Sequence, residues 1–111
     1  MLRASASVIS IEFEPRAITD RSLDPLLPNG RELLDLVDAV LTGTAQERAS
    51  TRQAVIEAVG PTGLVDAAAV IANFEMMNRI ADATGMPVGK GTLKRTAEWR
   101  ALIDIDRFNH L

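Results

Sequence analysis

The sequence predicts an all-α protein, a small bundle of about four helices preceded by an extended N-terminal arm. Apolar residues recur at helical spacing from residue 31 to residue 83. Glycine and proline divide this region into segments of helical length, and strand-like patterning is confined to one short stretch near the N-terminus. A chain of 111 residues suits a single domain. We therefore expect an arm and proline-rich loop over residues 1–29 and a helical domain over residues 30–111.

The first part of the chain carries little helical signal. Residues 8–13 (VISIEF) are rich in β-branched side chains and would present one apolar face if extended. No second strand candidate follows, so this segment is expected either to pack as an arm or to pair with another copy. The prolines of residues 14–29 predict a loop with at most one short turn, for which Asp24 and Pro25 are the expected N-cap and first residue.

Two amphipathic helices are predicted next. The first covers residues 31–41 and ends at Gly43, and the second opens with the capping-box pair Thr44 and Glu47 and runs to about residue 59. Each helix has an apolar face that is expected to be buried. The first face comprises Leu33, Leu34, Val37, Val40 and Leu41, and the second comprises Ala45, Ala49, Val55, Ile56 and Val59.

The central element is a helix over residues 62–87, which begins after Gly60 and Pro61. Between residues 64 and 72 its only polar side chain is Asp66, so this part is apolar nearly all round. A helix of that composition is expected to be surrounded by protein. Gly85 and Pro87 provide the stop signal. A glycine-rich connector then leads to a last helix, capped by Thr92 and ending near residue 105.

Composition excludes several classes of function. The chain has no cysteine, which rules out disulfides, thiol catalysis, cysteine-ligated zinc and iron–sulfur clusters. Its net charge of −3 and its pI near 5.1 argue against nucleic-acid binding. We find no secretory signal pattern and no run approaching the ~20 apolar residues that span a bilayer. A cytoplasmic protein without membrane contact is expected.

The residue pattern predicts no catalytic constellation, no cofactor and no metal site. Its lone histidine, His110, has no partner for either role. The polar residues of the central helix form a candidate polar pocket, and Asn73 is expected to be buried and hydrogen-bonded. Glu75 with Arg79, and Asn78 with Asp82, are four residues apart and are expected to interact. The candidate pocket comprises Asp66, Asn73, Asn78, Arg79 and Asp82.

One ordered set of residues in this region resembles a known family. Residues 69–74 (AVIANF), 77–83 (MNRIADA) and 85–87 (GMP) are similar to the pattern N-F-x-x-x-N-R-x-A-D-A-x-G-x-P of the alkylhydroperoxidase D-like, carboxymuconolactone decarboxylase superfamily. The resemblance covers residues 31–88, about half of the chain. It implies an all-α fold that assembles into dimers, trimers or hexamers. In this family Asn73, Asn78, Arg79 and Asp82 would be packing and polar support positions.

The family's peroxidases act through a Cys-x-x-Cys motif on a preceding helix, which this cysteine-free chain lacks. Thiol peroxidase activity is therefore not expected, because its nucleophile must be a thiolate. The leading interpretation is a non-catalytic module that forms a homodimer or larger homo-oligomer, or pairs with a second chain supplying the missing half. The alternative is a cofactor-independent, decarboxylase-like enzyme that uses carboxylates such as Asp66 or Glu75 at an intersubunit pocket.

Overall fold

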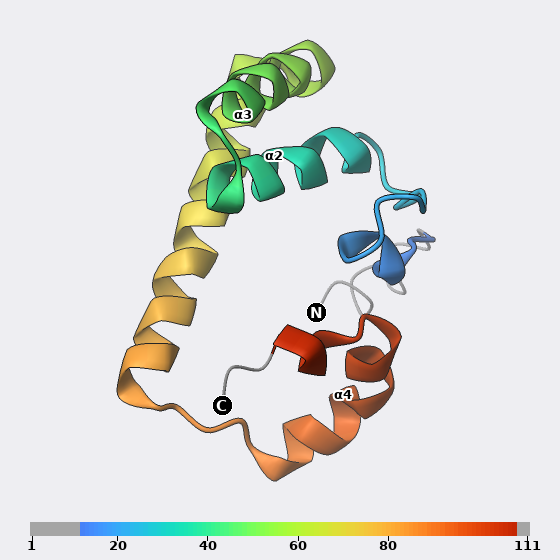
Figure 1. Ribbon diagram of the computed structural model, residues 1–111, viewed down its shortest axis with the longest axis vertical. Helices are drawn as coiled ribbons and strands as arrows, with labels where there is room; N and C mark the ends of the chain where they lie inside the picture. The colour runs from blue at the N-terminus through green and yellow to red at the C-terminus, as the bar shows by residue number, and fades with distance from the viewer. Residues whose placement is uncertain (1–11, 109–111) are drawn as a thin grey trace. The chain divides into compact units, whose positions relative to one another are not determined.

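The computed structural model describes residues 12–108, and over that range the chain is all-helical (Figure 1), which confirms the predicted class. No strand occurs among these residues. Most of the strand candidate at residues 8–13, and His110, lie outside them. The α-helices are α2 (Gly30–Thr42), α3 (Ala45–Thr84) and α4 (Lys90–Leu102), and the short 3-10 helices are η1 (Pro15–Ile18) and η2 (Ile105–Phe108).

The chain divides into two compact units. One consists of residues Asn29–Met86 and contains α2 and α3, while the other combines Met1–Pro28 with Pro87–Leu111. The first unit carries the residues that the sequence singled out.

Helix α2 packs against α3 (Figure 1) and buries part of one face. It follows Asn29, whose φ of 53° is left-handed, and it ends at Gly43 as predicted. Leu36 and Ala39 are its buried apolar residues. The predicted apolar face of α2 therefore differs from the face that is buried, since Val40 and Leu41 remain 43% and 46% exposed. The buried residues alternate along the chain with the predicted ones, so they lie on a different side of the helix.

Helix α3 begins with the capping box that the sequence predicts. The Glu47 N–H donates to Thr44 Oγ1 at 3.2 Å, and the Thr44 N–H donates to Glu47 Oε2 at 2.6 Å. At the other end Gly85 adopts a φ of 63° and its N–H donates to the carbonyls of Ala81 and Asp82. This is the expected glycine C-cap.

Gly60 interrupts α3 without ending it. Its φ of 81° and ψ of 170° are not helical, and Pro61 follows directly. The sequence placed a helix boundary here, and the backbone does break at this residue. Two helical stretches meet at this kink, and they are counted together as one helix that ends at Thr84. Counted in this way, the described residues contain three α-helices instead of about four.

Burial along α3 differs from the expectation. Of the apolar residues predicted to be buried before Gly60, only Val55 is fully buried, whereas Ala45 and Ala49 are exposed. After Gly60 the helix is covered by α2 on one side only. Val65 is 65% exposed and Val70 is 56% exposed. Within a single copy this helix is not surrounded by protein, because one helix shields only one face of another. Cover by a second copy stays a prediction.

The second unit contains the other helices. Glu14 caps η1, and its N–H donates to the carbonyl of Pro25 at 2.9 Å, which closes the loop between them. The Asp24 carboxylate accepts from the Leu26 N–H at 2.8 Å, but no helix begins there, so the predicted cap stabilises a turn. The rings of Phe13 and Trp99 lie 5.7 Å apart between centroids.

Helix α4 starts earlier than predicted. It begins at Lys90 after Gly89, which leaves Thr92 inside the helix and not at its N-cap. It ends at Leu102, before the predicted end near residue 105. Arg100 of α4 reaches Asp106 of η2 at 3.5 Å.

Candidate functional site

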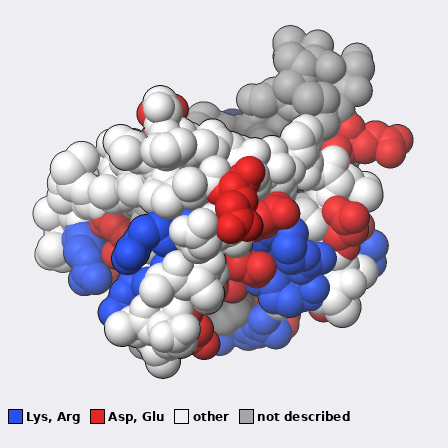
Figure 2. Space-filling model, turned by 90° about the horizontal axis from the view of Figure 1, so that it is seen from above, with Lys and Arg blue, Asp and Glu red and all other residues white. Residues whose placement is uncertain are grey.

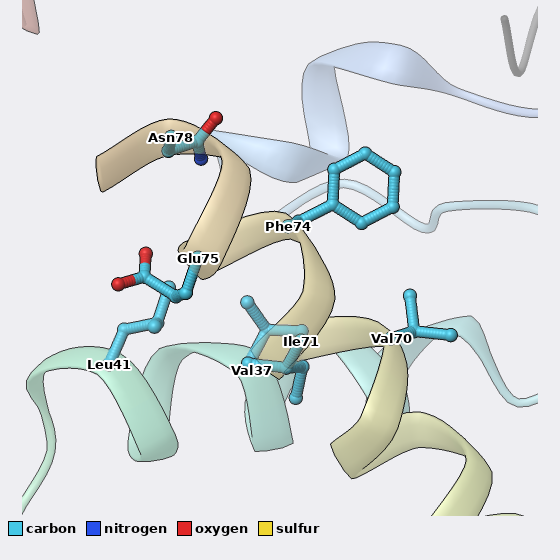
Figure 3. A pocket seen from close by; sticks show the side chains of 7 residues that line it. All are labelled: Val37, Leu41, Val70, Ile71, Phe74, Glu75 and Asn78. Carbon is cyan, nitrogen blue, oxygen red and sulfur yellow. The ribbon is translucent and has the colours of Figure 1, made fainter. Parts of the chain in front are cut away.

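A groove lies between α2 and α3 in the unit formed by residues 29–86 (Figure 3). Its volume is about 240 Å³. This is below the size typical of drug-sized ligand sites but sufficient for about eight water-sized groups. Its walls are apolar and come from both helices. Helix α2 contributes Val37 and Leu41, and α3 contributes Val70, Ile71, Phe74, Glu75 and Asn78.

Two polar groups stand at this groove. The Glu75 carboxylate is 34% exposed, and its Oε2 pairs with Arg79 Nε at 3.5 Å, as the four-residue spacing predicts. Asn78 follows one turn after Phe74 and is exposed. The groove therefore combines an apolar trough with one carboxylate and one amide. Glu75 is the one titratable side chain among the residues that line the groove.

Within one copy the residues of the candidate polar pocket are not brought together. Asp66, Asn73, Asn78, Arg79 and Asp82 are all exposed, and only Asn78 lines the groove. Residues 66 and 82 are separated by about 24 Å along the helix axis, so their side chains cannot converge within one copy. The expected burial of Asn73 is wrong. No hydrogen bond between Asn78 and Asp82 is present among the described residues.

A second feature of α3 is its outer stripe, a row of exposed residues on the side away from α2. Successive members are three or four residues apart, the spacing of a helix–helix seam. Val65, Met76 and Ile80 are 65%, 55% and 51% exposed. The outer stripe comprises Val65, Ala69, Ala72, Met76, Ile80 and Ala83. Sequence reasoning detected these residues as apolar but assigned them to a core.

Charge does not mark either feature. On the face seen in Figure 2, basic and acidic side chains are interspersed, without a broad patch of one sign. No cluster of three or more potential metal ligands is found among the residues that the structure describes.

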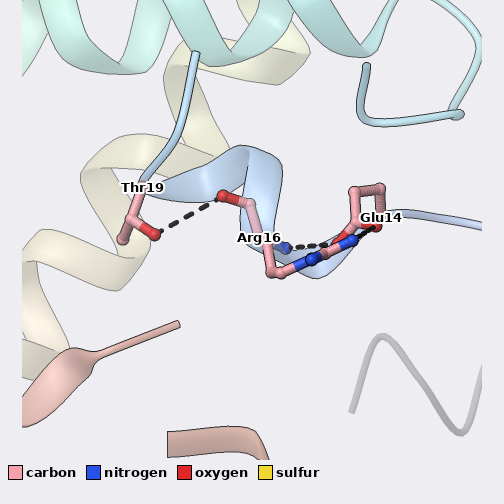
Figure 4. Close-up of polar contacts among 3 residues, drawn as sticks. All are labelled: Glu14, Arg16 and Thr19. Atoms are coloured by element: carbon pink, nitrogen blue, oxygen red, sulfur yellow. Dashed lines mark hydrogen bonds and ion pairs between the residues drawn. The ribbon is translucent and has the colours of Figure 1, made fainter. Parts of the chain in front are cut away.

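The carboxylates with perturbed pKa values are explained by local structure. Hydrogen bonds from the Arg16 side chain, and then from its N–H, lower the pKa of Glu14 to about 2 (Figure 4). Bonds from Ser22 lower the pKa of Asp20, and the capping bond from the Thr44 N–H lowers that of Glu47. All three lie outside the groove. These shifts reflect caps and turns and do not indicate a catalytic group.

Helix α3 also satisfies a membrane criterion that the sequence analysis did not anticipate. Within the described range it is the one helix long and apolar enough to cross a bilayer, judged by length and composition only. The apolar segment that meets the criterion is almost entirely unburied.

Comparisons with protein-family models, with curated proteins and with solved structures find no match to this chain.

Proposed function

We propose that this chain is a non-catalytic helical interaction module that self-associates through the outer stripe of α3. The observation that carries the proposal is the small amount of apolar burial within one copy. Among the described residues, the buried apolar side chains are Ala17, Leu36, Ala39 and Val55. Hydrophobic residues make up 47% of the chain. A soluble fold needs more cover than this, because burial must offset the conformational entropy lost on folding.

The spacing of the outer stripe favours a helix as the covering element. Val65, Ala69, Ala72 and Met76 follow one another at intervals of four, three and four residues. Side chains at these intervals interlock with the side chains of a second helix packed nearly parallel or antiparallel to the first. Exposed apolar surface of this kind usually marks an interaction site.

The distribution of side-chain sizes favours a second copy in antiparallel orientation. Ala69 and Ala72 lie before the midpoint of the stripe and Met76 and Ile80 after it, and the two ends are Val65 and Ala83. A parallel pair would place alanine against alanine and leave voids, whereas an antiparallel pair places a small residue opposite a large one. Antiparallel helix dipoles also attract each other. A two-fold dimer of this type uses the same surface from each copy.

The resemblance to the alkylhydroperoxidase D-like superfamily belongs to the same proposal. We propose that residues 31–88 form a half-domain of that type, whose relatives assemble through helices, and that the protein acts in the cytoplasm. A second chain carrying the Cys-x-x-Cys half is the alternative partner. Under either arrangement this chain contributes packing surface and not the reactive thiol, because it contains no cysteine.

Sedimentation velocity at micromolar concentration, in detergent-free buffer, tests the proposal. We expect a species of about twice the 12.0 kDa chain mass or larger, whose melting temperature rises with protein concentration. A single 12.0 kDa species that melts independently of concentration would refute it. Protein that stays with lipid vesicles and is insoluble without detergent would also refute it and would assign α3 to a membrane.

A further inference from the structure

The groove between α2 and α3 has the chemistry of a binding site for a small amphiphilic cation. We propose that it binds a primary alkylamine, with the alkyl chain along the apolar walls and the ammonium group on the Glu75 carboxylate. The inference is independent of the self-association proposed above, because the groove faces α2 and the outer stripe faces away from it.

The walls determine the apolar part of the ligand. Val37 lies beside Ile71 and Leu41 lies beside Glu75 (Figure 3), Phe74 and Val70 complete the apolar lining, and the volume of this open groove is about 240 Å³. Ligand sites between the helices of a bundle are commonly lined in this way, with a few polar groups that fix orientation. A chain of about six carbons with one head group matches this volume, on the basis of ~30 Å³ per water-sized group.

Glu75 determines the sign of the head group. It contributes the only charged side chain among the residues that line the groove, and it can accept hydrogen bonds from an ammonium group. The Asn78 amide oxygen, one turn away from Phe74 and three residues after Glu75, can accept a second bond. A carboxylate ligand would be repelled by Glu75, and an alcohol would lack the charge-assisted bond.

Arg79 is the competitor for this position. Its Nε lies 3.5 Å from Glu75 Oε2, and its side chain is 83% exposed. An exposed ion pair of this kind contributes little to stability, so an arriving ammonium group can replace the guanidinium at small cost. Arg79 therefore balances the charge of the Glu75 carboxylate when no ligand is bound, and it is not among the residues that line the groove.

The test is a chemical-shift titration of the full chain with three probes of equal length: hexylamine, hexan-1-ol and hexanoate. We expect saturable shifts at Ile71, Phe74 and Asn78 with hexylamine, and affinity at least about tenfold weaker for the alcohol and the acid. Glu75→Gln should lower hexylamine affinity about tenfold and leave hexan-1-ol unchanged. Arg79→Gln should strengthen hexylamine binding, whereas the matched variant Asp82→Asn, on the same helix but outside the groove, should have no effect.

Several outcomes would overturn the inference. Equal binding of amine and alcohol, unchanged hexylamine affinity in Glu75→Gln, or shifts centred on the outer stripe would each do so. Ile71→Phe provides a second check, because the larger ring should fill the groove and abolish binding of hexylamine. Its helix content, measured by circular dichroism, reports whether it folds. If Ile71→Phe does not fold, the comparison of Glu75→Gln with Asp82→Asn still tests whether hexylamine binds at Glu75.

Discussion

Thr44 and Glu47 satisfy each other at the start of α3: each side chain accepts a hydrogen bond from the other residue's backbone N–H, at 3.2 Å and 2.6 Å. Two backbone donors that a helix N-terminus would otherwise leave unpaired are thereby used. The pair fixes the point at which the chain turns from α2 into α3.

Thr44→Ala should destabilise the protein by about 1 kcal/mol, because it removes the acceptor for the Glu47 N–H. Urea unfolding at a fixed protein concentration measures the effect. Thr62→Ala is the matched control, since Thr62 is exposed within the helical part of α3. A loss in the control equal to that of Thr44→Ala would show that the capping box contributes nothing specific.

Gly60→Ala should destabilise by ~1–3 kcal/mol, because a φ of 81° with a ψ of 170° is a region that only glycine occupies readily. A Cβ at this position would meet no atom within 4 Å, so the cost comes from the backbone alone. Gly91→Ala, inside α4, should instead be neutral or stabilising by up to about 1 kcal/mol. Thermal melts of both variants at one concentration compare them. If alanine were tolerated equally at both positions, the bend at Gly60 would not exist in solution.

Met76→Glu should weaken self-association by at least about tenfold, because two copies would each bury a carboxylate in an apolar seam. Met86→Glu makes the same chemical change at a residue that is 63% exposed beyond the end of α3. Sedimentation equilibrium should show dissociation of the first variant only. Dissociation of both, or of neither, would place the interface elsewhere.

Ala72→Cys should form an intermolecular disulfide under mild oxidation, whereas Ala83→Cys should not. In an antiparallel pair centred on the outer stripe, Ala72 lies near the two-fold axis, but two Ala83 residues lie at opposite ends. Disulfides require Cα atoms within about 7 Å of each other. Non-reducing gel electrophoresis detects the disulfide-linked dimer without interference from other thiols, because the chain contains no native cysteine. Crosslinking at both positions would indicate a parallel pair.

The contact between Glu14 and Arg16 should make part of the stability depend on pH in the acid range. The pKa of Glu14 is lowered from its ordinary value of 4.5 to about 2. The contribution is therefore fully present above pH 4.5 and is lost as the pH falls through about 2. Arg16→Gln should raise the pKa of Glu14 toward 4.5, as measured by carbon-13 titration of its carboxyl group. An unchanged pKa in this variant would show that the side-chain bonds do not cause the shift.

Local signals in the sequence predicted local structure well. The all-α class, the capping box at Thr44, the stop at Gly43, the C-cap at Gly85 and the ion pair of Glu75 with Arg79 are all confirmed. Each depends on residues a few positions apart, which the sequence displays directly. Thr92 and Asp24 are exceptions, because a plausible cap residue does not prevent a helix from starting three residues earlier, as α4 does, and does not by itself start one.

Burial was predicted less well. The apolar composition predicted that the central helix and Asn73 are buried, but within one copy both are exposed to solvent. An apolar composition indicates that a surface must be buried, but it does not indicate whether the residues that bury it belong to the same chain. The groove was missed because Val37 and Leu41 join Ile71 and Phe74 only through the pairing of two helices, which periodicity alone does not specify.

The exposed thioethers of α3 have a chemical consequence. Met76 and Met77 are 55% and 44% exposed within one copy, so both side chains are open to peroxide whenever the copies are apart. Conversion to the sulfoxide would turn a flexible apolar side chain into a polar one within the outer stripe at Met76. A chain without any thiol would thus still have a surface that oxidants can modify, and methionine sulfoxide reductases could restore it.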